Sequence, residues 1–328
     1  MKYLIIGSNS FSGSNFINFL INKKHNVVGI SRSKEINDVF LPYKNNKNNK
    51  NYKFYKIDLN KDLKNLIKIC DTFKPSFIIN FSAQGMVAES WKSPIDWYNT
   101  NLIAQVKFHE EIRKKKYLKK YIHFTTPEVY GSTGNLISEN FNFAPSTPYA
   151  TSRAACDLHL MTFFKAYNFP VIFTRAANVY GAHQQMFRII PKTFFSILNK
   201  SKLTLHGGGK SVRSFIHIND VCEATYKICL KGTIGQSYHI STDENIKIIN
   251  LVKKLCQLTD SKFSNIVNIG KDRLGKDMAY LLSNKKINRE LGWTAKISLD
   301  DGLQQTLDWV SSNLDVLSKQ DLEYKHKV

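Results

Sequence analysis

The chain opens with Tyr3-Leu4-Ile5-Ile6-Gly7-Ser8-Asn9-Ser10-Phe11-Ser12-Gly13, an apolar run followed by a turn that two glycines bound. Phe16, Phe19 and Leu20 follow at helical spacing, so the stretch predicts a buried strand, a tight turn and a helix. Such a turn points backbone amides and the partial positive charge of a helix N-terminus at one place. It therefore predicts a dinucleotide site at the start of an α/β domain.

Strands and helices continue to alternate along the first half of the chain. Apolar runs predict strands at 26–30, 53–57, 76–81, 121–125 and 171–174, and amphipathic segments predict helices at 62–73, 96–116 and 149–167. This alternation is typical of a parallel sheet with helices on both faces, so we expect an α/β fold with a Rossmann-type doubly wound sheet. We assign residues 1–177 to this dinucleotide-binding domain.

The pattern loosens in the second half of the chain. Helical segments at 189–198, 218–230 and 248–258 alternate there with short strands such as 203–206. We expect residues 178–328 to form mainly a smaller α/β substrate-binding lobe, with chain crossings back to the first domain. The Asn- and Lys-rich stretch 44–51 has no packing pattern, and we expect it to be a mobile surface loop.

The first turn and several strand ends supply candidate cofactor-binding residues. The turn has the spacing Gly-x-x-Gly-x-x-Gly with Ser10 at the middle position. The second strand ends in Ser31 and Arg32, where an NAD site usually has an acidic residue. Because an arginine can pair with a 2′-phosphate, we predict NADP rather than NAD. The candidate set is Gly7, Asn9, Ser10, Phe11, Gly13, Ser31, Arg32, Asp58, Leu59, Ser82, Ala83, Gln84, Tyr149 and Arg153.

The candidate catalytic residues follow the fifth predicted strand. Thr126 and Glu128 lie at the end of that strand, and Tyr149 and Arg153 are four residues apart on one face of the next helix. Ligands of open α/β sheets bind at this edge. A tyrosine, with an ordinary pKa of ~10, needs a nearby cation to act as a base near neutral pH, and Arg153 supplies one. The group predicts redox and proton-transfer chemistry.

Separate motifs in a fixed order span nearly the whole chain. They are Asn80-Phe81-Ser82-Ala83-Gln84, Thr126-Pro127-Glu128-Val129-Tyr130-Gly131, Arg175 to Gly181, His206 to Val221, Asp272 to Asp277 and Leu291-Gly292-Trp293. Together they resemble the extended short-chain dehydrogenase/reductases that act on nucleotide sugars. Within that family they look most like the NDP-hexose 4,6-dehydratases of the dTDP-glucose and GDP-mannose types.

The resemblance implies a nucleotide-sugar substrate and transient oxidation of its C4 by bound NAD(P). It implies that Tyr149 removes the O4 proton and that Glu128 moves the C5 proton to the departing O6 hydroxyl. It also implies that the substrate is held by Gln84, Thr126, Asn178, Arg188, Arg213 and Arg273. Arginines suit this task because their planar forks pair with phosphate oxygens.

Three departures from the family pattern keep alternatives open. Arg153 stands where the family has lysine, Pro127 where the dTDP-glucose type has an aspartate acid, and Met86 where a histidine is usual. Glu128 would then have to act on both protons, as the GDP-mannose type implies. The alternatives are an NDP-sugar 4-epimerase, an NDP-uronic acid decarboxylase, since decarboxylases also carry Thr-x-Glu, and a non-catalytic cofactor-binding protein.

Composition and charge limit the kinds of partner and the location that we expect for this protein. The net charge of +21 comes from lysines spread along the chain without an aromatic strip, so we expect no nucleic-acid partner. No apolar run reaches the ~20 residues of a membrane helix, and a first strand at Lys2 leaves no room for a signal peptide. Five cysteines with no Cys-x-x-Cys pair indicate reduced thiols in a cytoplasm and no metal site.

We also expect a homodimer. The predicted helices 96–116 and 149–167 carry more apolar residues than one core stripe needs, and in the resembling family the corresponding helices pair across subunits. The surplus residues are Leu102, Val106, Phe108, Leu158, Leu160, Met161 and Phe164.

Overall fold

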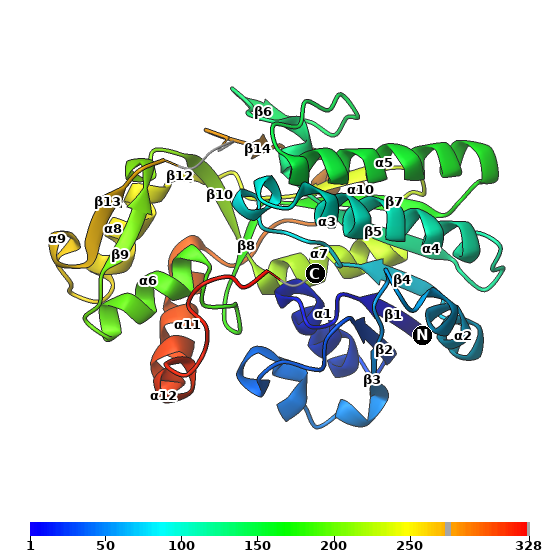
Figure 1. The fold of residues 1–328 in the computed structure, drawn as a ribbon, viewed down its shortest axis with the longest axis horizontal. Helices are drawn as coiled ribbons and strands as arrows, with labels where there is room; N and C mark the ends of the chain where they lie inside the picture. The colour runs from blue at the N-terminus through cyan, green and yellow to red at the C-terminus, as the bar shows by residue number, and fades with distance from the viewer. Residues whose placement is uncertain (273–276, 327–328) are drawn as a thin grey trace.

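A parallel seven-stranded sheet forms the centre of the computed structural model, which describes residues 1–272 and 277–326 (Figure 1). The strand order is β11-β7-β5-β4-β1-β2-β3, and every neighbouring pair is parallel. The predicted Rossmann-type α/β fold is confirmed. The strands are β1 (Lys2–Ile6), β2 (Asn26–Ser31), β3 (Tyr52–Lys56), β4 (Phe77–Asn80), β5 (Lys120–Thr125), β7 (Val171–Ala176) and β11 (Ser237–Ile240).

Helices cover both faces of this sheet because successive strand residues point to opposite sides. Tyr3 and Ile5 of β1 lie in one core cluster with α1 (Phe11–Asn22), α7 (Ile218–Lys231) and α10 (Lys285–Leu291). Leu4 and Ile6 lie in a second cluster with α2 (Leu63–Phe73), α4 (Ala104–Ile112) and α5 (Pro148–Tyr167). Phe108 of α4 and Leu160 of α5 are fully buried in that second cluster, so the expectation that they are surplus apolar residues was wrong.

A smaller group of elements packs beside the carboxyl ends of the central strands (Figure 1). Its own core joins α6 (Ile189–Leu198), α8 (Ile248–Gln257) and α11 (Leu299–Ser312). The remaining elements are β6 (Leu136–Ile137), β8 (Asn178–Tyr180), β9 (Leu203–His206), β10 (Val212–His217), β12 (Asn245–Lys247), α9 (Phe263–Ile266), β13 (Val267–Gly270), β14 (Leu281–Leu282) and α12 (Leu314–Leu317). β11 and α7 come from the second half of the chain yet belong to the central layers.

The predicted helix 96–116 has different bounds and an irregular middle. It starts at Pro94, with α3 (Pro94–Tyr98), passes through a π-helical turn at Asn99–Ile103, and ends with α4 at Ile112. In the π-turn the buried Asn101 bonds to the backbone of Gln84 and to the Ser152 hydroxyl. A π-turn changes the direction of its side chains relative to those of a regular helix. Asn101 lies inward there, and these polar partners satisfy the hydrogen-bonding groups of its side chain.

The stretch 44–51 overlaps two 3₁₀ turns, Pro42–Asn45 and Asn49–Asn51, and its own residues are exposed or partly buried. Just before it, the Tyr43 ring is fully buried in the central core. The Asn46 side-chain amide donates to Asn18 and Asn22 of α1 at 2.6 and 2.9 Å. These bonds hold part of the stretch against α1, and the mobility expected of this surface loop stays a prediction.

Two further observations concern the chain as a whole. All five cysteines are buried and unpaired. Within residues 1–272 and 277–326, none of the helices combines the length and the apolar character that crossing a membrane requires.

Candidate functional site

The first turn has a geometry that only glycine tolerates at two positions. Gly7 has φ +84°, and a Cβ there would lie 2.7 Å from the Ser82 backbone nitrogen. A Cβ on Gly13 would lie 2.3 Å from the Gly7 carbonyl oxygen. Ser10 caps α1: its hydroxyl accepts from the Gly13 amide at 3.0 Å and donates to the Gly7 carbonyl at 2.7 Å. Ser10 at the middle position therefore holds the two ends of the turn together through its hydroxyl.

Polar groups around this turn fit a dinucleotide. The Asn9 side-chain carbonyl and the Arg153 Nε are buried and have no hydrogen-bond partner within the described residues. Asn9 lies in the turn before α1, and Arg153 reaches the Ser82 backbone, against which Gly7 is packed. Orphaned polar atoms, close backbone and helix amides are what a pyrophosphate and its riboses require. The site therefore fits NAD(P).

Some of the other cofactor candidates have side chains that can reach a bound dinucleotide, and others hold the backbone around it. Phe11 and Leu59 have buried side chains in the two central core clusters, so they can offer only backbone atoms. Asp58 accepts from the Asn60 amide at 2.9 Å and holds the turn after β3. Ser31 accepts from the Asn9 amide at 3.0 Å. Arg32 reaches across to the Gln84 side-chain carbonyl at 3.3 Å.

Thr126 and Glu128 sit in a 3₁₀ turn, Pro127–Tyr130, directly after β5. The Thr126 hydroxyl donates to a Glu128 carboxylate oxygen and accepts from the Glu128 amide at 3.3 Å. Gly131 ends the turn with φ +68°, where a Cβ would lie 2.3 Å from the Ala144 carbonyl oxygen. Pro127 is buried at the first position of the turn, which its fixed φ favours. The turn holds the hydroxyl and the carboxylate together.

Tyr149 joins this pair from the first turn of α5. The Thr147 hydroxyl caps that helix by accepting from the Ala150 amide at 3.1 Å. Burial, then the nearby Glu128 charge, raise the pKa of Tyr149 to about 12, while Arg153 and the Thr126 hydroxyl oppose the rise. Burial also raises the pKa of Glu128, against the Thr126 hydrogen bond. A carboxyl with a raised pKa can both take and return a proton near neutral pH.

Arg153 is buried between the ends of two central strands. One of its terminal nitrogens donates to the Phe124 carbonyl at the end of β5 and lies 3.4 Å from the His123 ring. The other lies 3.5 Å from the Ser82 carbonyl after β4. Its charge is thus anchored between two strand ends, one helical turn from Tyr149, and lowers the pKa of that phenol.

The remaining substrate candidates come from the second half of the chain. The Arg213 guanidinium donates to the Asp277 and Val212 carbonyls, each at 2.8 Å, and stacks 4.1 Å above the Tyr280 ring. The Tyr280 hydroxyl donates to the Asn178 side chain at 2.9 Å. Arg188, just before α6, and Arg213 both act to lower the pKa of Glu128, so both are near it. Arg273 lies outside the described residues.

Sequence reasoning missed two residues of this site. Asn101 fixes both the amide and the carbonyl of Gln84, but its inward position depends on the π-turn. Tyr280 forms the floor under Arg213, and burial, then the nearby Glu128 charge, raise its pKa. Its place in the sequence, three residues after Asp277, gives a weak signal because the tyrosine belongs to no motif of its own.

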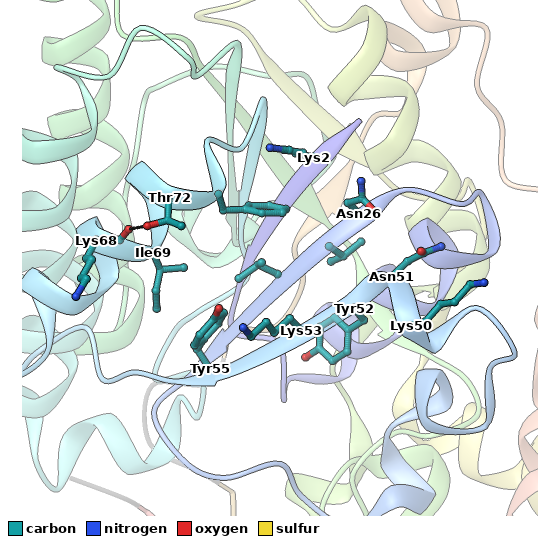
Figure 2. A pocket seen from close by; sticks show the side chains of 13 residues that line it. Lys2, Asn26, Lys50, Asn51, Tyr52, Lys53, Tyr55, Lys68, Ile69 and Thr72 are labelled. Carbon is teal, nitrogen blue, oxygen red and sulfur yellow. Dashed lines mark hydrogen bonds between the residues drawn. The ribbon is translucent and has the colours of Figure 1, made fainter.

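A separate hollow lies at the other end of the central sheet. Figure 2 shows this pocket of about 510 Å³, which Lys2 and Asn26 at the starts of β1 and β2 line together with Lys50, Lys53 and Lys68. Ligands of parallel sheets bind at the carboxyl ends of the strands. The glycine turn and the Thr126–Glu128–Tyr149 group lie at those carboxyl ends, so the hollow is not the functional site.

Comparisons with known proteins agree with this geometry. The GDP-mannose 4,6 dehydratase family model matches residues 4–306. A dTDP-glucose 4,6-dehydratase of Haemophilus influenzae is 29% identical, over 95% of this chain and 98% of that protein. The dTDP-D-glucose 4,6-dehydratase of Homo sapiens is 31% identical, over 74% of this chain and 71% of that protein.

A solved structure extends the agreement to three dimensions. The crystal structure of a dTDP-glucose 4,6-dehydratase from Streptomyces venezuelae, with NAD bound, superposes with a TM-score of 0.89 at 26% identity. The match covers 96% of this chain and 98% of that one. With the family model, the curated relatives and the site geometry in accord, the chain belongs to the GDP-mannose 4,6-dehydratase family of NAD(P)-dependent enzymes.

Proposed function

We propose that this protein is a nucleotide-sugar 4,6-dehydratase, which converts an NDP-hexose to an NDP-4-keto-6-deoxyhexose. One observation carries the proposal: Thr126, Glu128 and Tyr149 form a single group, in which burial raises the pKa of both acids. A phenol and a carboxyl that lie close enough for the charge of one to shift the pKa of the other are suited to successive proton transfers. dTDP-glucose, the sugar nucleotide in the names of the relatives, is the first substrate to test.

The reaction divides a difficult elimination into easier steps. Tyr149 takes the O4 proton, and the bound NAD(P) supplies reversible hydride chemistry between C4 and C6 of the sugar. The new C4 ketone acidifies the C5 proton, which Glu128 removes and delivers to the departing O6 hydroxyl, so that water leaves. When hydride returns to C6, C5 takes up a proton, and the O4 proton held by Tyr149 balances this uptake. Because Pro127 has no proton to give, Glu128 serves as both base and acid. Thr126 holds its carboxylate in place for both.

The two parts of the chain divide the binding work in this proposal. Residues 1–177 hold the dinucleotide through the first turn, Gln84 and Arg153. Residues 178–328 mainly hold the nucleotide sugar, through Asn178, Arg188 and Arg213, and the charges of the two arginines act on Glu128. The contact between Tyr280 and Arg213 supports this role, since a stacked guanidinium is fixed in plane for paired bonds to phosphate oxygens. The buried unpaired thiols fit a reducing compartment such as the cytoplasm.

Product analysis tests the proposal directly. The protein is incubated with a panel of nucleotide sugars that includes dTDP-glucose, GDP-mannose and UDP-glucuronic acid, and the products are identified by mass spectrometry. A dehydratase removes one water from the sugar. Loss of carbon dioxide would identify a decarboxylase, an isomer of unchanged mass would identify a 4-epimerase, and no product from any sugar would indicate a non-catalytic binding protein.

The cofactor proposal is that NADP binds more tightly than NAD. Arg32 gains a charged partner only from the 2′-phosphate, and a charged hydrogen bond is worth about 1.5–3 kcal/mol. We expect Arg32→Ala to weaken NADP binding about 10- to 100-fold and to leave NAD binding nearly unchanged. Titration calorimetry with both dinucleotides measures this, with the exposed neighbour Lys34→Ala as the control. Equal affinities for the two cofactors in the parent protein would contradict the proposal.

The assembly proposal is a homodimer through the α3–α4 region and α5. Ile95, Ile103 and Leu158 expose 70%, 45% and 47% of their surfaces on these helices, which pack against each other. Apolar groups gathered in this way are better covered by a second copy than by water. Sedimentation at micromolar concentration should give twice the mass of one chain, and Leu158→Asp should shift it toward the monomer. A single-chain mass for the parent protein would refute the dimer.

A further inference from the structure

The C-terminal tail, residues 319–326, crosses from the smaller lobe to the dinucleotide-binding half. After α12 it runs back toward the centre of the molecule (Figure 1), where His326 contacts α3. Along the tail, exposed residues alternate with partly buried ones. An extended segment places every second side chain on one face, so Leu322, Tyr324 and His326 face the protein.

The start of the tail is held by the smaller lobe. Leu322 packs against the core of α6 and α11. Glu323 forms an ion pair with Lys192 of α6, although its side chain is largely exposed. An exposed pair contributes little stability, so the apolar contact is the main anchor here.

The middle of the tail lies on groups already placed at the dinucleotide site. The Tyr324 hydroxyl donates to the Gln84 side-chain carbonyl at 3.3 Å, and Arg32 donates to the same oxygen at 3.3 Å. The Tyr324 ring meets the Phe187 ring edge-on, with centroids 5.5 Å apart. Burial raises the pKa of the Tyr324 phenol, while the positive charges of Arg32 and Arg188 act to lower it. Tyr324 therefore lies between the proposed cofactor and substrate residues.

The end of the tail is docked on the dinucleotide-binding half. The His326 ring stacks on the buried Trp97 of α3 with centroids 4.8 Å apart and planes 15° apart. Its Nε2 lies 2.9 Å from the Asp96 carboxylate. The tail is thus attached to the smaller lobe at Leu322 and to the dinucleotide-binding half at His326, and Tyr324 lies between these two attachments.

We propose that residues 319–326 act as a strap that retains the bound dinucleotide, and that Tyr324 is a positioning residue that acts through Gln84. The proposal rests on the proposed function only for the location of the dinucleotide. The attachments are few and partly exposed, so the strap can open at low cost without unfolding either lobe. A closed strap suits a reaction in which the same dinucleotide must accept a hydride and later return it.

Release of the dinucleotide is the measurement that tests the strap. Reduced dinucleotide is bound to the full chain without sugar, and its loss after a chase with excess oxidised dinucleotide is followed by fluorescence in a stopped-flow instrument. We expect Tyr324→Ala combined with His326→Ala to release it at least about tenfold faster. Tyr324→Phe keeps the ring on Phe187 and loses one hydrogen bond, so it should release about two- to tenfold faster.

Lys325→Ala is the matched control, because Lys325 lies in the same tail and faces solvent. Its release rate should equal that of the parent protein. A merely structural role predicts a lower melting temperature of the ligand-free Tyr324→Phe chain with unchanged release, and that result would overturn the strap. Unchanged release in both tail variants, with dehydration intact, would overturn the strap and leave the proposed function standing. A parent chain that bound no dinucleotide would overturn both.

Discussion

Glu128→Gln should lower turnover by about 10²- to 10⁴-fold while the dinucleotide and the sugar nucleotide still bind. Glutamine keeps the shape of the side chain and can still bond to Thr126, but it cannot take the C5 proton. The sugar should therefore stall as the 4-ketone, with its hydride held on the cofactor. Absorbance near 340 nm in a single-turnover experiment should rise and stay high, whereas the parent protein should show only a transient rise.

The exposed Glu111→Gln, on α4, is the control and should behave like the parent. The pH profile gives a second readout. Since burial raises the pKa of Glu128, the parent rate should increase with pH through a value above the ordinary glutamate range, and this limb should vanish in Glu128→Gln. Near-parental turnover by Glu128→Gln would rule out the dehydratase mechanism and favour a 4-epimerase, which needs no base at C5.

Tyr149→Phe should block the reaction one step earlier, also by about 10²- to 10⁴-fold. Phenylalanine leaves the ring in its buried place and removes the group that takes the O4 proton. Oxidation at C4 cannot begin, so no reduced cofactor should appear even in a single turnover. This absence distinguishes Tyr149→Phe from Glu128→Gln, in which reduced cofactor accumulates.

Tyr167→Phe is the matched control, because it changes the same residue type at the far end of α5, where the side chain is 52% exposed. The pKa of Tyr149, about 12 in the ligand-free protein, should fall when a cation binds beside it, and Arg153 already acts in that direction. Accumulation of reduced cofactor by Tyr149→Phe at the parental rate would show that another group is the O4 base.

The catalytic steps that these variants test depend on four residues that the sequence pattern indicated. Thr126, Glu128, Tyr149 and Arg153 were predicted to meet because a strand end and a helix face are local features. The structure places them in contact or in one another's electric field. Their separate roles stay predictions until the variants are measured.

Polar side chains shape two segments that hydrophobic periodicity describes incompletely. Asn46 of the stretch 44–51 bonds to α1, and the mobility expected of that stretch stays a prediction. The predicted helix 96–116 is present as a helical run from Pro94 to Ile112, but the bonds of Asn101 accompany a π-turn in its middle. Hydrophobic periodicity carries no trace of such bonds, since an inward asparagine looks like any other polar residue in the sequence.

The sequence by itself determined the fold class, the glycine turn and the strand-end chemistry, because each depends on neighbours a few residues apart. Only the tertiary structure decided which distant groups complete the site. Tyr280 reaches Asn178, and Tyr324 reaches Gln84, through contacts that join residues 102 and 240 positions apart. Contacts of this kind follow from how elements distant in the sequence pack, and no local pattern of spacing or charge encodes that packing.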